Sequence, residues 1–393
     1  MKSLKIGDQI EVEVGPIAHG GHFISRHNGQ VIFVRHAITG EKAVVKITSV
    51  SSKLAHGDAI KILSESSDRV EPTCNHAHPD GCGGCDFQHI ERSAQQNFKL
   101  EVIKDQFMRI AKIEVDPEML SAKPSDGLHW RTRFDFAVSE NGKAGLYSSK
   151  TKKIIEIDEC TIAHKDINNS EIFSKKWNGS DRVRVAVSSS NQLNISRGKK
   201  TIAGPKKIRE VVGDNIYDIS PQSFWQSHAQ APSVLSNLAI DFMKLNPGDV
   251  VCDLYGGVGL FTMPITKKIG NDGHVHLVEL SNHSVRDASK IFKDYNNVSI
   301  HRGSVDRKLP NIDNIDIIVL DPPRSGAGKI VVDQIISKKP KAVVYISCDP
   351  ASLARDAKFL QDSGYELEKI NAIDLFPMTH HVECIVRFIP SAN

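Results

Sequence analysis

A series of short apolar segments in the C-terminal part of the chain constrains the fold most strongly. Strands are expected near residues 250–254, 274–278, 298–300, 315–320 and 342–346, with helical intervals between most of them. Strands that alternate with helices form a parallel sheet covered on both faces, because each helix packs back onto the sheet that it crosses. We therefore predict a doubly wound α/β domain over residues 216–393.

Two of these strands run directly into residues that carry reactive groups. One ends in Ser347-Cys348-Asp349-Pro350, and the other ends in Asp321-Pro322-Pro323-Arg324. Open α/β sheets bind their ligands at the carboxyl ends of the strands. A thiol and a carboxylate at this edge predict covalent chemistry on a planar substrate, whereas a cysteine that only packs against its neighbours is the alternative. Basic residues nearby, such as Arg355, are expected to lower the pKa of the thiol.

A glycine-rich loop follows the first strand of this domain. Residues 249–254 lead into Tyr255-Gly256-Gly257-Val258-Gly259, and the third glycine of the dinucleotide fingerprint is replaced by Thr262. Glu279 ends the next strand, where a carboxylate can accept the hydroxyls of a ribose. This combination favours S-adenosylmethionine over NAD, and the alternative is a Rossmann-like fold without a cofactor.

The part of the chain before residue 216 has a different pattern. Residues 1–65 alternate apolar and polar side chains between glycine turns, which predicts a small β-barrel of the OB type. This segment resembles a TRAM domain, an RNA-binding barrel. Residues 66–215 combine a helix expected over 93–112 with strands such as 132–138, which predicts an α+β domain.

Bulk properties favour a cytoplasmic protein with no membrane contact. No apolar run among the 393 residues approaches the roughly 20 that a membrane span needs, and the first residues lack a signal peptide. The net charge is only +3, but basic residues bunch at Lys150, Lys152 and Lys153 and again between Arg197 and Arg209. Such clusters can neutralise RNA phosphates or can simply be a solvated surface.

Seven cysteines in a cytoplasmic chain indicate metal binding or catalysis rather than disulfides. Cys74, Cys82 and Cys85 form a C-x7-C-x2-C cluster, and Cys160 lies far downstream. Spacing leaves three possibilities open: an iron–sulfur cluster, a zinc site that also uses His76 or His78, and a metal-free fold. The remaining Cys252 and Cys384 lie in apolar strands and are expected to be core residues.

Three further strings carry a family resemblance: Asp321-Pro322-Pro323-Arg324-Ser325-Gly326, the segment 346–356 around Cys348, and the segment 374–383 that ends in His380-His381-Val382-Glu383. With the barrel and the cysteine cluster, the chain resembles the S-adenosylmethionine-dependent RNA uracil-5 methyltransferases that contain TRAM and iron–sulfur domains. The resemblance implies a Rossmann-like class I methyltransferase domain over residues 216–393, with Cys348 as nucleophile and Glu383 as general base.

The same resemblance assigns the other site residues and the substrate. Cofactor contacts fall on Gln226, Tyr255, Glu279 and Asp321, and a [4Fe-4S] cluster falls on Cys74, Cys82, Cys85 and Cys160, although the first cysteine gap is longer than expected. The implied reaction makes 5-methyluridine in RNA, with 23S-type ribosomal RNA favoured over transfer RNA. The alternatives are an amino-group or cytosine-5 methyltransferase, or a non-catalytic iron–sulfur protein that binds RNA. A monomer without an obligate protein partner is expected.

Overall fold

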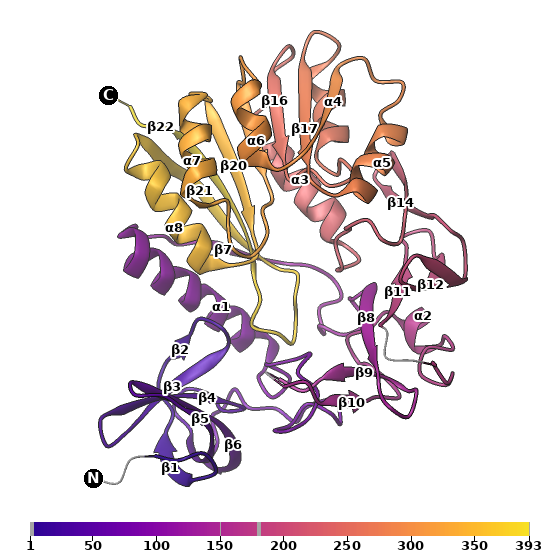
Figure 1. The fold of residues 1–393 in the computed structure, drawn as a ribbon. Helices are drawn as coiled ribbons and strands as arrows, with labels where there is room; N and C mark the ends of the chain where they lie inside the picture. Colours follow the sequence, from indigo (N-terminus) through magenta and orange to yellow (C-terminus); the bar gives the residue numbers. More distant parts are fainter. Residues whose placement is uncertain (1–3, 150, 179–181, 393) are drawn as a thin grey trace.

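The computed structural model describes residues 4–149, 151–178 and 182–392 (Figure 1). Lys150, part of one expected basic cluster, lies outside the described residues. A six-stranded sheet at the N-terminus has the order β1-β5-β6-β4-β3-β2 and wraps around a single apolar core. Its strands are β1 (Gln9–Glu13), β2 (Ile17–Ala18), β3 (His22–His27), β4 (Gln30–Arg35), β5 (Lys42–Val50) and β6 (Leu54–Ser64).

The middle of the chain builds a second sheet and a separate hairpin. The sheet has the order β10-β9-β8-β11-β12-β13, and β14 pairs with β15. Its core includes Trp130, Phe134 and Phe136. The elements are β8 (Arg133–Val138), β9 (Ala144–Tyr147), β10 (Ile154–Glu156), α2 (Lys165–Asn168), β11 (Val183–Val187), β12 (Leu193–Arg197), β13 (Lys200–Ala203), β14 (Ile208–Val212) and β15 (Asn215–Ile219).

An eight-stranded sheet dominates the C-terminal part, in the order β18-β17-β16-β19-β20-β22-β21-β7. The strands from β18 to β20 are parallel, whereas β22 is antiparallel to both of its neighbours. This confirms the five strands predicted from the apolar segments. The strands are β7 (Glu118–Ser121), β16 (Val250–Leu254), β17 (His274–Glu279), β18 (Val298–Arg302), β19 (Ile317–Leu320), β20 (Ala342–Ser347), β21 (Tyr365–Asp374) and β22 (Glu383–Pro390).

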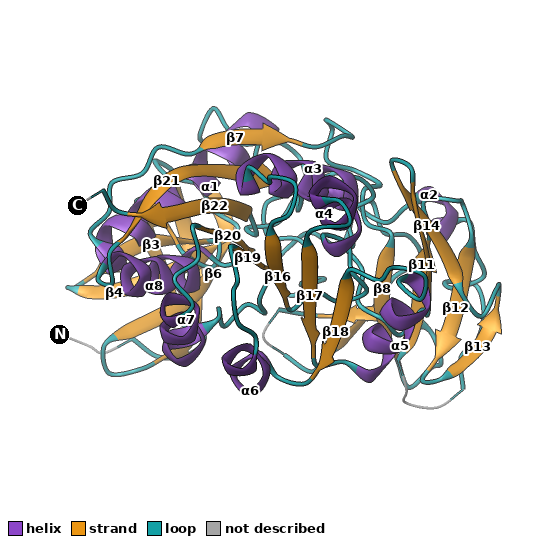
Figure 2. Cartoon of the chain, turned by 90° about the horizontal axis from the view of Figure 1, so that it is seen from above, coloured by secondary structure: helices purple, strands orange, loops and turns teal. Residues whose placement is uncertain are grey.

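Helices cover both faces of this sheet, as Figure 2 shows from above. One apolar core lies beneath α3, α4 and α5, and the other lies beneath α6, α7, α8 and α1. The doubly wound α/β architecture is therefore confirmed. The helices are α1 (Arg92–Gln106), α3 (Ala231–Met243), α4 (Thr262–Ile269), α5 (Asn282–Ile291), α6 (Val305–Lys308), α7 (Gly328–Ser337) and α8 (Pro350–Gln361), with the short turns η1 (Phe107–Ala111) and η2 (Leu309–Asn311). None of the helices in the described part of the chain could cross a bilayer.

Helix α1 and strand β7 come from the middle of the chain but pack on the large sheet. The Glu91 carboxylate caps α1 by accepting hydrogen bonds from the backbone N–H groups of Ser93 and Ala94. The helix then closes in the π-helical turn η1, which ends at Lys112. Strand β7 pairs with β21 in parallel, so the large sheet takes strands from both sides of residue 215.

A buried ion triad fixes α1 to the large sheet. Asp374, the last residue of β21, accepts hydrogen bonds from Lys99 Nζ at 2.7 Å and from Arg92 Nη2 at 2.6 Å. Lys99 and Asp374 are both fully buried. Although burial raises the pKa of the Asp374 carboxyl, the charges of Lys99 and Arg92 bring it down to about 2. The carboxylate therefore stays ionised between its two cations.

Replacing Asp374 by alanine should lower the free energy of unfolding by about 3–5 kcal/mol, because Lys99 would remain buried without a counter-charge. Chemical denaturation measures this loss. A matched control is Asp362→Ala, which removes an exposed partner of Lys358 and should change stability by about 0.5 kcal/mol or less. Equal stabilities for Asp374→Ala and the wild type would show that the triad does not hold α1.

The pH dependence of stability gives a second readout of the same triad. An unfolded aspartate has a pKa of about 3.9, so a folded pKa of about 2 contributes stability that is complete above about pH 5. This contribution should be lost as the pH falls towards 2, and Asp374→Asn should lose less stability over that range.

Candidate active site

The ends of four neighbouring strands bring the predicted catalytic residues together. The chain reverses its winding between β16 and β19, and such a switch point opens a crevice at the carboxyl edge of the sheet. Asp321 follows β19 directly. Ser347, at the end of β20, lies opposite Cys384 of β22. This antiparallel register places Cys348 beside Glu383.

Burial raises the pKa of the central acids and of the thiol, and neighbouring carboxyls add to this for Cys348 and Glu383. Burial, followed by the carboxyls of Glu383 and Asp321, raises the pKa of Cys348 to about 12. Burial also raises the pKa of Asp321 to about 7 and that of Glu383 well above its usual range. Glu383 Oε1 is buried and has no hydrogen-bond partner among the described residues. The site therefore holds a buried acid whose free oxygen can take part in proton transfer.

The expected effect of Arg355 on the thiol is wrong. Arg355 forms an ion pair with Asp356 and donates a hydrogen bond to the carbonyl oxygen of Ser325, so its charge is already compensated. Arg324, from the Asp-Pro-Pro-Arg string, is the cation that acts on the pKa of Cys348. Its lowering effect is smaller than the opposing effect of burial.

Two of the predicted cofactor residues lie at the glycine loop, and the other two are joined by a hydrogen bond. Tyr255 begins the loop in a left-handed conformation, with φ of +61°. Glu279 accepts a hydrogen bond from the backbone N–H of Gly257 at 3.0 Å. A Cβ atom added to Gly257 would meet nothing within 4 Å, so the loop borders open space. Gln226 Nε2 donates to Asp321 Oδ2 at 3.2 Å, which links the two.

Sequence reasoning missed Asp253, which lies in β16 immediately before this loop. Its Oδ2 accepts hydrogen bonds from the backbone N–H and the hydroxyl of Thr262, whereas its buried Oδ1 has no partner among the described residues. Burial raises the pKa of Asp253 to about 7. An aspartate inside an otherwise apolar strand was the available signal. Its contact with Thr262 fixes the start of α4 behind the loop.

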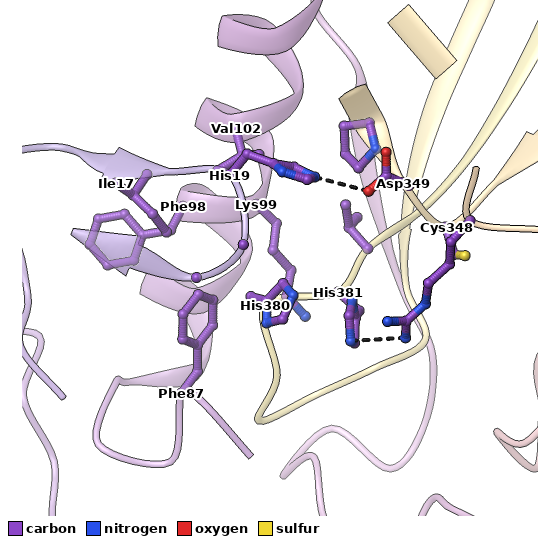
Figure 3. A pocket seen from close by; sticks show the side chains of 15 residues that line it. Ile17, His19, Phe87, Phe98, Lys99, Val102, Cys348, Asp349, His380 and His381 are labelled. Atoms are coloured by element: carbon purple, nitrogen blue, oxygen red, sulfur yellow. Dashed lines mark hydrogen bonds and ion pairs between the residues drawn. The ribbon is translucent and has the colours of Figure 1, made fainter. Parts of the chain in front are cut away.

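A pocket beside Cys348 is built from three distant parts of the chain (Figure 3). The turn between β2 and β3 contributes His19, α1 contributes Phe98 and Lys99, and the loop before β22 contributes His380 and His381. Arg324 also lines the pocket and lies 3.0 Å from the His381 Nε2 atom. Arg324, three histidines and the buried Lys99 therefore line the pocket together with the carboxylate of Asp349.

The four predicted cluster cysteines also come together. Cys74, Cys82, Cys85 and Cys160 all line one cavity next to Phe134 and Arg131. Burial raises the pKa of Cys82, Cys85 and Cys160, and the neighbouring thiols act in the same direction. No three His, Cys, Asp or Glu side chains in the described ranges converge closely enough to hold one metal ion.

The other two cysteines and part of the second basic cluster have structural roles. Cys252 and Cys384 are fully buried in one apolar core, which confirms the prediction. Lys207 pairs with Asp287 at 2.8 Å and Arg209 pairs with Asp218 at 2.8 Å. This part of the second basic cluster therefore has its charge compensated within the protein.

Comparisons with known proteins cover almost the entire chain. A family model described as tRNA (Uracil-5-)-methyltransferase matches residues 180–389, and the TRAM domain model matches residues 4–60. A protein of Streptomyces avermitilis, named as an RNA methyltransferase, is 35% identical over 99% of this chain and 100% of its own length. A similarly named protein of Corynebacterium glutamicum is 33% identical over 98% of this chain and 97% of its own length.

A solved structure has the same overall fold. The tRNA (uracil-54, C5)-methyltransferase of Pyrococcus abyssi, crystallised with S-adenosyl-L-homocysteine, superposes with a TM-score of 0.70 at 23% identity. The match covers 96% of this chain and 100% of that one. The arrangement of barrel, middle part and large sheet is therefore shared.

The thiol of Cys348 should react with iodoacetamide at a rate that keeps rising with pH. Because its pKa is about 12, the thiolate fraction should grow about tenfold per pH unit between pH 7 and pH 10. Mass spectrometry of the peptide that contains Cys348 measures the rate, and Cys348→Ser provides the blank. A plateau near neutral pH would show that the thiol is already ionised.

Proposed function

Because this chain belongs to the tRNA (uracil-5-)-methyltransferase family and carries a TRAM domain, we propose that it transfers a methyl group from S-adenosylmethionine to carbon 5 of a uridine in RNA. The observation that carries this proposal is the meeting of Cys348, Glu383 and Asp321 at the switch point of the sheet. Methylation of an amino group needs no thiol. A requirement for Cys348 would therefore distinguish methylation at carbon 5 from methylation of an amino group.

The cofactor would bind along the crevice between the glycine loop and Asp321. Glu279 has acceptor capacity left for ribose hydroxyls, and Tyr255 and Gln226 would contact the remainder of the molecule. The space beside Gly257 and the unpartnered oxygens of Asp253 and Glu383 support this fit. When bound, S-adenosylmethionine would supply the methyl group and a positive sulfonium charge.

Cys348 would make carbon 5 reactive by attacking its neighbour. Asp321 would accept the proton of the Cys348 thiol, and the thiolate sulfur would then form a bond to carbon 6 of the uracil while the electron pair of the carbon 5–carbon 6 double bond makes carbon 5 nucleophilic. Carbon 5 would take the methyl group that the bound cofactor supplies, which leaves a neutral thioether. Glu383 then removes the proton from carbon 5. The double bond reforms, the carbon 6–sulfur bond breaks, and the thiolate is released.

The electrostatics of the site determine when these groups can ionise. Without ligands, burial and mutual repulsion hold the protons on Cys348 and Glu383. A positive charge beside Asp321 and Glu383 favours their ionised forms, because opposite charges stabilise each other strongly where water is excluded. Glu383 would therefore become a base only in the loaded site.

The uridine must leave its stack to reach the thiol, as enzymes that modify bases in folded RNA generally require. The middle part of the chain and the TRAM barrel would hold the surrounding RNA. We favour ribosomal RNA over transfer RNA, because the chain combines a TRAM barrel with a cysteine cluster. Mapping 5-methyluridine in cells with and without the gene distinguishes the two RNA classes.

A [4Fe-4S] cluster on Cys74, Cys82, Cys85 and Cys160 is part of the proposal. Support comes from the single cavity that the four thiols share and from the like charges that four adjacent thiolates would place there. Iron would compensate those charges. The cavity lies within the middle part of the chain.

Cys348→Ala should abolish methylation, because carbon 5 cannot be activated without the thiolate. In cells that lack the gene, expression of the wild type should restore 5-methyluridine at one site in ribosomal RNA, detected by mass spectrometry of RNA fragments. The variant should restore none, although it should bind S-adenosylmethionine as the wild type does. Cys384→Ala removes a buried thiol beside Glu383 and should keep turnover. Methylation by Cys348→Ala would rule out the covalent route, and restoration in transfer RNA would reassign the substrate.

Protein purified without oxygen should contain about four iron and four sulfide per chain, if the cluster is bound as proposed. Cys85→Ser should lower both values and broad visible absorbance together, whereas Cys252→Ser should leave them unchanged. Zinc in place of iron, measured by elemental analysis, would contradict the cluster assignment.

A further inference from the structure

The N-terminal barrel touches the candidate nucleophile's loop through a single turn. Strands β2 and β3 pair in antiparallel register, and His19, Gly20 and Gly21 form the turn between them. His19 Nε2 donates a hydrogen bond to Asp349 Oδ2 at 3.0 Å, as the dashed line in Figure 3 marks. Asp349 follows Cys348 directly. A residue of the barrel therefore holds the backbone next to the thiol.

Asp349 fixes the turn on which Cys348 lies. Its Oδ1 accepts a hydrogen bond from the backbone N–H of Ser352 at 2.8 Å, which caps helix α8. Its own backbone N–H donates to the Ser347 hydroxyl at 3.2 Å. Cys348 therefore lies between Ser347, the last residue of β20, and Asp349, the N-cap residue of α8. His19 binds the remaining carboxylate oxygen, so it restrains the capping side chain from the opposite side.

The same turn also contacts the segment that leads to Glu383. Gly21 has φ of +73°, and an added Cβ would lie 2.6 Å from the Cβ of His380. His380 Nδ1 is in turn 2.6 Å from Asp86 Oδ2. One short turn of the barrel therefore packs against both segments that supply the proposed nucleophile and the proposed base.

The turn rests on a rigid support. Phe23 of β3 packs edge-on against Phe98 of α1, with ring centroids 5.3 Å apart, and both belong to the barrel core. Helix α1 is fixed to the large sheet by the buried Lys99–Asp374 pair. The position of His19 relative to Cys348 is therefore set by packed elements at each step.

The contact itself contributes little to global stability. The side chains of His19 and Asp349 are 38% and 24% exposed, and exposed ion pairs contribute weakly to folding. Its location beside the thiol, rather than its strength, is what distinguishes it from an ordinary surface pair.

We propose that His19 is a positioning residue for Cys348: through Asp349 it holds the thiol in the orientation needed to attack carbon 6. The inference rests on the proposed function. The barrel would then have a role in catalysis as well as a role in RNA binding. A misplacement of about 1 Å in a reacting group can cost about 100-fold in rate, so a weak contact at this place can have a large catalytic effect.

The test compares His19→Leu with His19→Gln. Leucine cannot donate a hydrogen bond, whereas the glutamine amide can place a donor near the position of Nε2. His27→Leu, at the far end of β3, is the matched control. RNA from cells that lack the gene serves as substrate, and labelled methyl transfer gives kcat and KM. His19→Leu should lower kcat about 10- to 100-fold. KM for RNA, binding of S-adenosylmethionine and the midpoint of thermal unfolding should stay near wild-type values.

A variant that restores the hydrogen bond and a double variant complete the experiment. His19→Gln should recover most of the lost kcat, and His27→Leu should lie within about twofold of the wild type. Adding His19→Leu to Asp349→Ala should cause no further loss, because both changes break the same contact. Wild-type kcat in His19→Leu, a loss confined to KM for RNA, or additive losses would overturn the inference. Absence of methyl transfer by the wild type would instead refute the proposed function.

Discussion

The buried carboxylate of Asp374 connects the parts of this protein. It binds Lys99 and Arg92 of α1 at the end of a strand of the large sheet, where an uncompensated charge would be costly. Helix α1 also supplies Phe98 to the core of the barrel. The barrel and the large sheet are therefore both fixed to α1. Without that arrangement, no residue of the barrel could reach the neighbourhood of Cys348.

The proposed chemistry depends on the same exclusion of water. Cys348 and Glu383 lie at facing strand ends in surroundings that disfavour their charged forms. The thiol has a raised pKa, and the carboxyl group of Glu383 has a buried oxygen with no partner among the described residues. Both features suit a site whose reactive forms arise only when the methyl donor and the RNA are in place. The loop that leads to Glu383 is held by the contact between His380 and Asp86, the neighbour of Cys85.

Local sequence patterns predicted the parts of the fold that depend on local physics. The apolar segments predicted the five parallel strands from β16 to β20, and the ends of two of these strands predicted Cys348 and Asp321, because side-chain periodicity is visible over a few residues. The contact between His19 and Asp349 joins residues 330 positions apart, and no local pattern encodes it. The pairing of strand β7 with β21 also joins distant parts of the chain, so it could not be predicted from a local pattern either. The prediction for Arg355 failed because the sequence does not show that Asp356 pairs with it.

The most direct test of the account is the covalent bond between Cys348 and RNA. In RNA that contains 5-fluorouridine, fluorine replaces the proton that Glu383 would remove, so elimination cannot follow methylation. The account predicts a stable protein–RNA adduct on a denaturing gel, and mass spectrometry should find a methylated, fluorinated nucleotide on the peptide that carries Cys348. Efficient methylation of ordinary RNA with no adduct on the fluorinated RNA, or an adduct on a different cysteine, would contradict it.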